Sequence, residues 1–164
     1  MGIDTWDEIR TAYQVARLGT VSGAARCITV VQRATREAKP ANPRGVGVGG
    51  AVNTGGYLGG WRSTALAPIG AAVFNGKLHA AIIEDGRRPG GFLPPREIIM
   101  RWAQRRLGLS EAEAKRAAWP IARAIQRRGL LPRKVMDGAV PEMVDVVQEE
   151  QVRELDAAMQ SRSG

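Results

Sequence analysis

The stretch SEAEAKRAAWPIARAIQRRG, residues 110–129, predicts the best-defined helix of this chain. Ser110 and Glu113 have the spacing of a capping box, in which each side chain binds a free backbone N–H at the start of a helix. Gly129 is typical of the position just after a helix. Four apolar residues recur within a narrow arc: Ala114, Ala118, Ile121 and Ile125. Burial of this arc predicts that the arginines on the opposite side face solvent, a partner or a lumen; these are Arg116, Arg123 and Arg127.

Further helices are predicted on both sides of this stretch. Pro94 and Pro95 open one that ends at Gly108, since proline is tolerated in the first turn of a helix. A last helix is predicted from about Val140 to Met159, because apolar residues recur there at helical spacing. We expect the final residues, 160–164, to be disordered.

The N-terminal segment predicts two helices, over residues 5–18 and about 20–39, separated by Gly19. The sequence VARLGTVSGAA, residues 15–25, resembles the opening of the helix-turn-helix in LysR-type transcription regulators, where a third helix enters the major groove. The expected third helix is missing after Ala25. A DNA-binding regulator that uses this segment is the alternative hypothesis for function.

The middle of the chain predicts a loop followed by short strands. Residues 40–56 are rich in glycine and proline, which favours an extended loop. β-compatible residues follow at 57–66 and 69–74, and Asn75-Gly76 is a hairpin-turn signal. Residues 79–84 fit either a third strand or a helical turn. This order predicts an α+β fold, with a small antiparallel β-sheet packed with N-terminal and C-terminal helices.

We expect residues 1–164 to form a single domain, because this length suits one hydrophobic core. The predicted segments are N-terminal helices at 1–39, a glycine- and proline-rich loop at 40–56, a central core at 57–140, and an acidic C-terminal helix and tail at 141–164.

Charge is distributed unevenly along the chain, whose net charge is +8. Residues 86–134 contain thirteen Lys or Arg and three Asp or Glu, whereas residues 141–160 contain six Asp or Glu and one Arg. A basic middle and an acidic tail favour either contact with nucleic acid or head-to-tail complementarity between subunits. The alternative is a solvated basic face.

Signals for catalysis and for bound cofactors are weak. His79 is the only histidine, and no Cys/His cluster has the spacing of a metal site. The single Cys27 could pair with His79 in a small enzyme, a third hypothesis, although a small buried hydrophobe is the simpler interpretation. The glycine run at 45–50 lacks the sequence context of a phosphate-binding loop. We therefore expect no catalytic, metal or cofactor site, and no membrane span because no long apolar run occurs.

Several short blocks between Val52 and about Val140 resemble, in order and spacing, the neck-region tail-component (tail-completion) family of tailed phages. These blocks are VNTGGYL (52–58) and GWR (60–62), VFN (73–75) and HAAIIEDG (79–86), RRPG (87–90), PP (94–95) and IMRW (99–102), and finally ARAI (122–125) and RGL (128–130). The match covers a little over half of the chain. Asn53 stands where the family has aspartate, and His79 where it has tyrosine.

This resemblance implies a structural virion protein at the head–tail junction that is not an enzyme. Such subunits form sixfold or twelvefold rings between portal or connector proteins and tail-terminator or tail-tube proteins. In such a ring, arginines would face genomic DNA in the lumen or an adjacent subunit; the candidates are Arg87, Arg88, Arg116, Arg123 and Arg127. The candidate acidic contacts on that adjacent subunit are Glu142, Asp145, Glu149 and Glu150. The implied location is the virion, assembled in the host cytoplasm.

Overall fold

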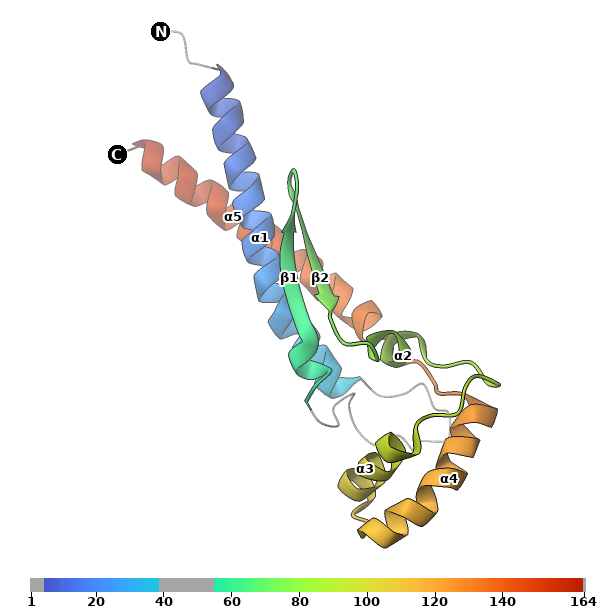
Figure 1. Cartoon of the computed structure of the whole chain (residues 1–164). Coiled ribbons are helices and arrows are strands. Elements are labelled where there is room, and N and C mark those ends of the chain that lie inside the picture. Colours follow the sequence, from blue (N-terminus) through green and yellow to red (C-terminus); the bar gives the residue numbers. More distant parts are fainter. Residues whose placement is uncertain (1–4, 39–54, 164) are drawn as a thin grey trace. The chain divides into compact units, whose positions relative to one another are not determined.

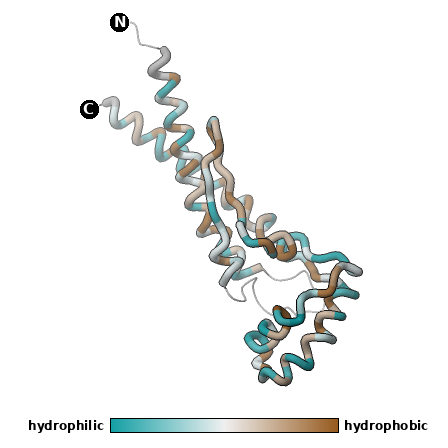
Figure 2. Tube along the Cα trace, viewed as in Figure 1, coloured by the Kyte–Doolittle hydropathy of each residue, from teal (hydrophilic) through white to brown (hydrophobic). Residues whose placement is uncertain are grey.

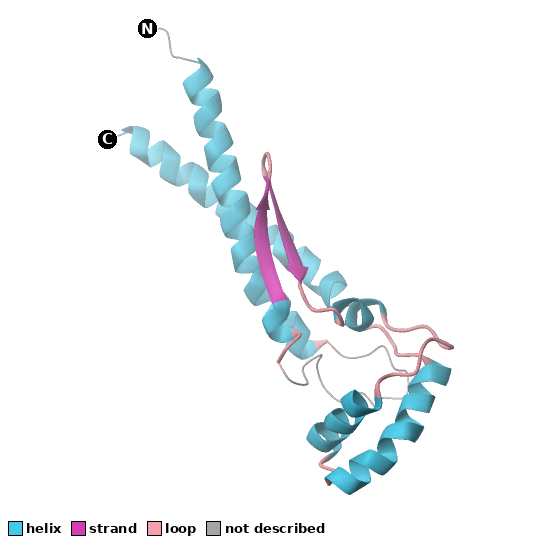
Figure 3. Ribbon diagram, in the orientation of Figure 1, coloured by secondary structure: helices cyan, strands magenta, loops and turns pink. Residues whose placement is uncertain are grey.

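The structure is a computed structural model that describes residues 5–38 and 55–163. Within these residues it contains helices and one two-stranded antiparallel sheet, so the predicted α+β class is confirmed (Figures 1 and 3). The elements are α1 (Thr5–Glu37), a short 3-10 turn (Leu58–Gly60), β1 (Trp61–Leu66), β2 (Gly70–Asn75), α2 (Ala80–Asp85), α3 (Arg96–Leu107), α4 (Glu111–Arg128) and α5 (Val135–Ser163). None of the helices described is long and apolar enough to cross a membrane.

The chain divides into two compact units. The long-helix unit comprises Met1–Ala34, Gly60–Gly76 and Met136–Gly164, and the basic unit comprises Thr35–Gly59 and Lys77–Val135. The long-helix unit has seven Lys or Arg and ten Asp or Glu, a net charge of −3, whereas the basic unit has seventeen and six, a net charge of +11. The single domain and its segment boundaries remain predictions.

In the long-helix unit, α1 is one continuous helix, so the prediction of two helices separated at Gly19 is wrong. Gly19 and Gly23 are buried one turn apart on the same face of α1. A Cβ on Gly19 would lie 2.7 Å from the Cα of Gln151 in α5. These glycines therefore permit close helix packing rather than a turn. The helix-turn-helix geometry suggested by residues 15–25 does not form, because its turn is absent.

The hairpin β1–β2 lies along the two long helices (Figure 1). Its strands pair from Trp61 opposite Asn75 to Leu66 opposite Gly70, so the turn lies between Leu66 and Gly70. The expected turn at Asn75-Gly76 is wrong, because Asn75 ends the second strand. The Tyr13 hydroxyl of α1 donates a hydrogen bond to the carbonyl of Pro68 (2.6 Å), which fixes the tip of the hairpin.

The structure decides three further sequence predictions. Residues 80–85 form α2, so the choice between a third strand and a helical turn is settled as helix. Helix α5 begins at Val135, earlier than predicted, because buried Val135 and Ala139 extend its apolar side by one turn. It continues to Ser163, so the disorder predicted for residues 160–164 is wrong for 160–163. Gly164 and residues 40–54 of the loop predicted at 40–56 lie outside the described residues.

In the basic unit, α3 and α4 pack against each other around a small apolar core. Ile99 of α3 is buried against Ala118 and Ala122 of α4, and polar and apolar segments alternate along both helices (Figure 2). The capping box that begins α4 is confirmed: Ser110 N–H donates to a Glu113 carboxylate oxygen (2.9 Å), and Glu113 N–H donates to the Ser110 hydroxyl (3.4 Å). This core positions the exposed face of α4.

Candidate functional surface

The basic loop after α2 is fixed by backbone hydrogen bonds to the C-terminal end of α4. Arg87 N–H donates to the carbonyl of Leu130 and Leu130 N–H donates to the carbonyl of Arg87, both at 2.8 Å. Gly90 N–H donates to the carbonyl of Gln126 at 2.7 Å. Three backbone hydrogen bonds therefore hold the loop to a segment about forty residues later in the chain.

Two glycines make this close contact possible. Gly86 has φ 74° and Gly129 has φ 72°, values that residues with a side chain rarely adopt. A Cβ on Gly86 would collide with the carbonyl oxygen of Leu130, and one on Gly129 would collide with the carbonyl oxygen of Arg87. Gly90, in the same loop, also has a positive φ of 83°. The sequence blocks 86–90 and 128–130 are therefore in close backbone contact in the fold.

The candidate arginines lie mainly on the outside of the basic unit. Four of the five candidate arginines have exposed side chains: Arg88, Arg116, Arg123 and Arg127. Arg87 is half-buried, because its backbone belongs to the contact with Leu130. On the other side of α4 the alanines are buried: Ala114, Ala118 and Ala122. The predicted division of α4 into an apolar and a basic side is confirmed, whereas the partner of the basic side stays a prediction.

An exposed tryptophan belongs to this basic side and was not singled out from the sequence. The ring of Trp119 lies 5.5 Å from the Arg123 guanidinium carbon and 5.8 Å from that of Arg96 at the start of α3. Such cation–π contacts contribute about 0.5–1 kcal/mol at exposed sites. The available signal was the spacing, since Trp119 precedes Arg123 by one helical turn. Trp119 and its two arginines add an aromatic contact area to the basic face.

Three of the four candidate inter-subunit carboxylates form ion pairs with arginines of α1 within the long-helix unit. Glu150 is buried and forms ion pairs with Arg26 and Arg153. Arg26 also lies 3.7 Å from Glu149, and Glu142 pairs with Arg33 of α1. For Glu150 the interpretation as an inter-subunit contact is therefore corrected, because its carboxylate is enclosed within its own chain. Asp145 remains exposed.

The residues considered for catalysis lie in different units. Cys27 is buried in the long-helix unit, its Sγ lies 3.5 Å from the carbonyl oxygen of Met143, and burial raises the pKa of the thiol. His79 is exposed in the basic unit, with its ring 6.3 Å from that of Tyr57.

Tyr57 has a structural partner of its own. Its hydroxyl donates to Glu84 at 2.5 Å, and burial, followed by this carboxylate, raises the pKa of Tyr57. In the part of the chain that the structure describes, no group of three His, Cys, Asp or Glu residues could hold a metal ion. The glycine run at 45–50 lies outside that part. The basic face is therefore the candidate site with the best-defined geometry.

Comparisons with protein-family models, with curated proteins and with solved structures give no significant match to this chain.

Proposed function

We propose that this protein is a structural, non-enzymatic subunit of a ring at the head–tail junction of a tailed phage, either a neck connector or a tail-completion protein. The observation that carries the proposal is the contact between Arg87 and Leu130. It joins two of the sequence blocks that resemble the neck-region family, at positions where a Cβ on Gly86 or Gly129 would collide with the opposite backbone. Gly86 and Gly129 shape a fixed loop beside an arginine-rich helix, which is a demand of docking and not of catalysis.

The charge division between the units supports ring assembly. A ring is built from heterologous contacts, in which two different surfaces of the same chain must complement each other. A unit of net charge −3 and a unit of net charge +11 provide such surfaces. Opposite charges favour the correct pairing and disfavour contacts between like surfaces.

The basic face of α4 also suits a lumen through which a genome passes. Arginines bind phosphates without reading sequence, and the affinity they provide falls steeply with salt. In the proposed ring, Arg116, Arg123 and Arg127 face either this DNA or an acidic neighbour. The proposed partners are portal or connector proteins on one side and tail-terminator or tail-tube proteins on the other, within a virion assembled in the host cytoplasm.

The experiment that tests this function is a mass measurement over a wide concentration range. We expect light scattering coupled to size-exclusion chromatography to give a closed oligomer of about six or twelve subunits, with ring-shaped particles in electron micrographs. A strict monomer at every concentration that also fails to join purified heads or tails would contradict the proposal.

The rival hypothesis of a DNA-binding regulator makes a different prediction in the same preparation. It requires binding to one duplex sequence in preference to others, through the N-terminal segment. That segment is the uninterrupted helix α1, with Gly19 and Gly23 buried against α5. Binding of equal strength to unrelated duplexes, lost at high salt, fits the ring and not the regulator.

A further inference from the structure

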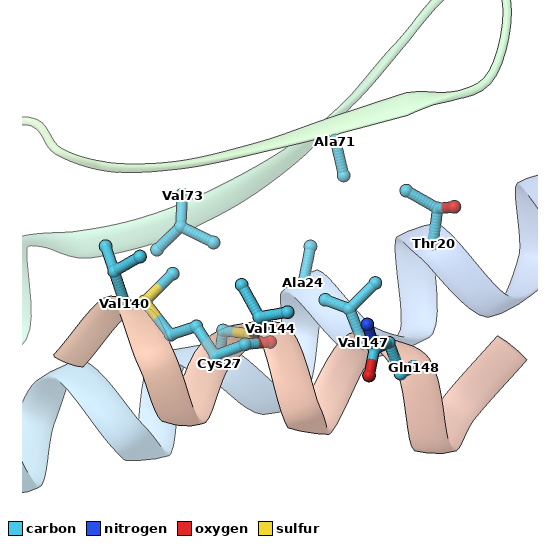
Figure 4. A pocket seen from close by; sticks show the side chains of 10 residues that line it. Thr20, Ala24, Cys27, Ala71, Val73, Val140, Val144, Val147 and Gln148 are labelled. Atoms are coloured by element: carbon cyan, nitrogen blue, oxygen red, sulfur yellow. Dashed lines mark hydrogen bonds between the residues drawn. The ribbon is translucent and has the colours of Figure 1, made fainter.

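The long-helix unit contains an apolar pocket between the hairpin and the two long helices. It has a volume of about 350 Å³ and is lined mainly by small and branched apolar side chains, including Ala24, Cys27, Val73, Val140, Val144 and Val147. Figure 4 shows Val73 of β2 facing Val140 and Val144 of α5 across this space. Val140 and Val144 are 45% and 49% exposed, so the pocket is open to a partner.

The basic unit carries a large apolar side chain with no burial. Phe92 is 93% exposed in the loop between the basic turn and α3. The loop is fixed nearby, since Gly90 N–H donates to the carbonyl of Gln126 and Pro94 leads into α3. An aromatic side chain held on a fixed loop and left in water is a strong candidate for an interface anchor.

Charge around the two features is complementary. Phe92 follows Arg88 by four residues, a reach of at most roughly 14 Å. The apolar pocket shares Gln148 with a second hollow on α5, whose other walls are Asp145, Glu149, Val152, Arg153 and Asp156, three carboxylates against one guanidinium. Val144 and Gln148 are one turn apart on α5, so the apolar pocket and the second hollow lie side by side on the same helix.

We propose that Phe92 of one copy inserts into the apolar pocket of a second copy, with Arg88 placed toward the acidic hollow beside it. The contact is heterologous, because the anchor and the pocket are different surfaces, and it repeats from copy to copy until the ring closes. The inference rests on the proposed ring function and names the surfaces that form it. Phe92 is a better anchor than Leu78, which is fully exposed, because Phe92 shares its loop with Arg87 and Arg88.

Photo-crosslinking of the full-length chain tests this contact. Phe92 is replaced by p-benzoylphenylalanine, and the protein is mixed with an equal amount of unmodified chain labelled with nitrogen-15. After irradiation, mass spectrometry should find peptides that join residue 92 of the light chain to residues 140–148 of the heavy chain. The same replacement at Leu78 is the matched control and should give no such peptide.

Two substitutions in the heavy chain locate the acceptor. Val144→Arg places a charge in the pocket and should lower the cross-link yield at least about tenfold, since burial of a Phe side chain is worth a factor of roughly ten to a hundred in affinity. Leu155→Arg lies on the same helix at a similarly exposed position outside the pocket, and it should leave the yield unchanged. Phe92→Ala should raise the dissociation constant of the oligomer by the same factor.

The outcomes separate this inference from the proposed function. An oligomer of ring mass without the link from 92 to 140–148, or with a link only within one chain, overturns the inference and leaves the ring intact. Absence of any oligomer together with absence of the link contradicts both. A link that Val144→Arg and Leu155→Arg reduce equally overturns the pocket as the acceptor.

Discussion

Gly23 of α1 lies directly against the backbone of Val147 of α5, where a Cβ on the glycine would come within 2.8 Å of the Val147 Cα. Gly19, one turn earlier, has the same relationship to Gln151. The two contacts run in opposite directions along the two helices, so α1 and α5 pack as an antiparallel pair. Close approach of their backbones places Arg26 and Arg33 within reach of carboxylates on α5.

The first prediction concerns this close approach. Gly23→Ala should destabilise the protein by roughly 1–2 kcal/mol, because overpacking against backbone outweighs the gain of about 1 kcal/mol in helix propensity. The measurement is urea denaturation followed by circular dichroism. Gly138→Ala is the control, because Gly138 of α5 has nothing within 4 Å of its Cβ position, and this change should stabilise by about 0.5–1 kcal/mol. Stabilisation by both changes would show that α1 and α5 are not in close contact.

The second prediction concerns the buried carboxylate of Glu150. Glu150→Gln should lower the free energy of unfolding by about 1–3 kcal/mol, because Arg26 loses a charged hydrogen-bond acceptor and Arg153 loses its ion-pair partner. Glu149→Gln is a matched control at the next residue: Glu149 is exposed and 3.7 Å from Arg26, so its loss should cost less than about 1 kcal/mol. Equal effects of the two changes would mean that Glu150 is not enclosed.

The third prediction concerns the basic face of α4. Arg123→Glu combined with Arg127→Glu should leave the circular dichroism spectrum and the unfolding midpoint nearly unchanged, because both side chains are exposed. The same double change should reduce ring assembly or salt-dependent binding to duplex DNA. Lys115→Glu is the control: Lys115 is exposed on the same helix but lies roughly 80–120° around its axis from Arg123 and Arg127, so this change should have a smaller effect on both. If the double variant were unfolded, we would conclude that these arginines belong to the buried side of α4.

The fourth prediction concerns pH and the start of α4. The hydroxyl and backbone N–H of Ser110 donate to Glu113 and hold the pKa of its carboxyl below the usual range. A lowered pKa in the folded state gives stability that is present above the unfolded pKa, about 4.3, and is lost as the pH falls through the folded value. Glu113→Gln should therefore be less stable than the parent at neutral pH. Denaturation at a series of pH values should show this difference shrinking in acid, and a constant difference would exclude the ionised capping box.

The fifth prediction concerns the thiol of Cys27. Burial raises its pKa, so the reactive thiolate is scarce in the folded protein. A thiol reagent should modify native protein far more slowly than urea-unfolded protein at the same pH. Gly23→Ala, which forces α1 away from α5, should speed the reaction in the native state. Fast modification of the unaltered native protein would contradict the burial of this residue.

Local signals in the sequence were sufficient where one segment decides its own conformation. The capping box of Ser110 and Glu113 and the apolar arc that includes Ala114 and Ala118 depend only on neighbours within a few residues. The same reasoning placed Arg123 and Arg127 outside, because burial of one side of a helix exposes the other.

Tertiary contacts decided the positions that local signals misjudged. Gly19 has the sequence character of a helix end, yet α1 continues through it because the backbone of α5 occupies the space that a side chain would need. Glu150 has the character of a surface residue, yet Arg26, distant in the chain, encloses its charge. The sequence alone determined the fold class and the basic side of α4, since these follow from local periodicity. Which glycines are packing points and which carboxylates are internal depended on long-range contacts, whose free energy outweighs local propensity.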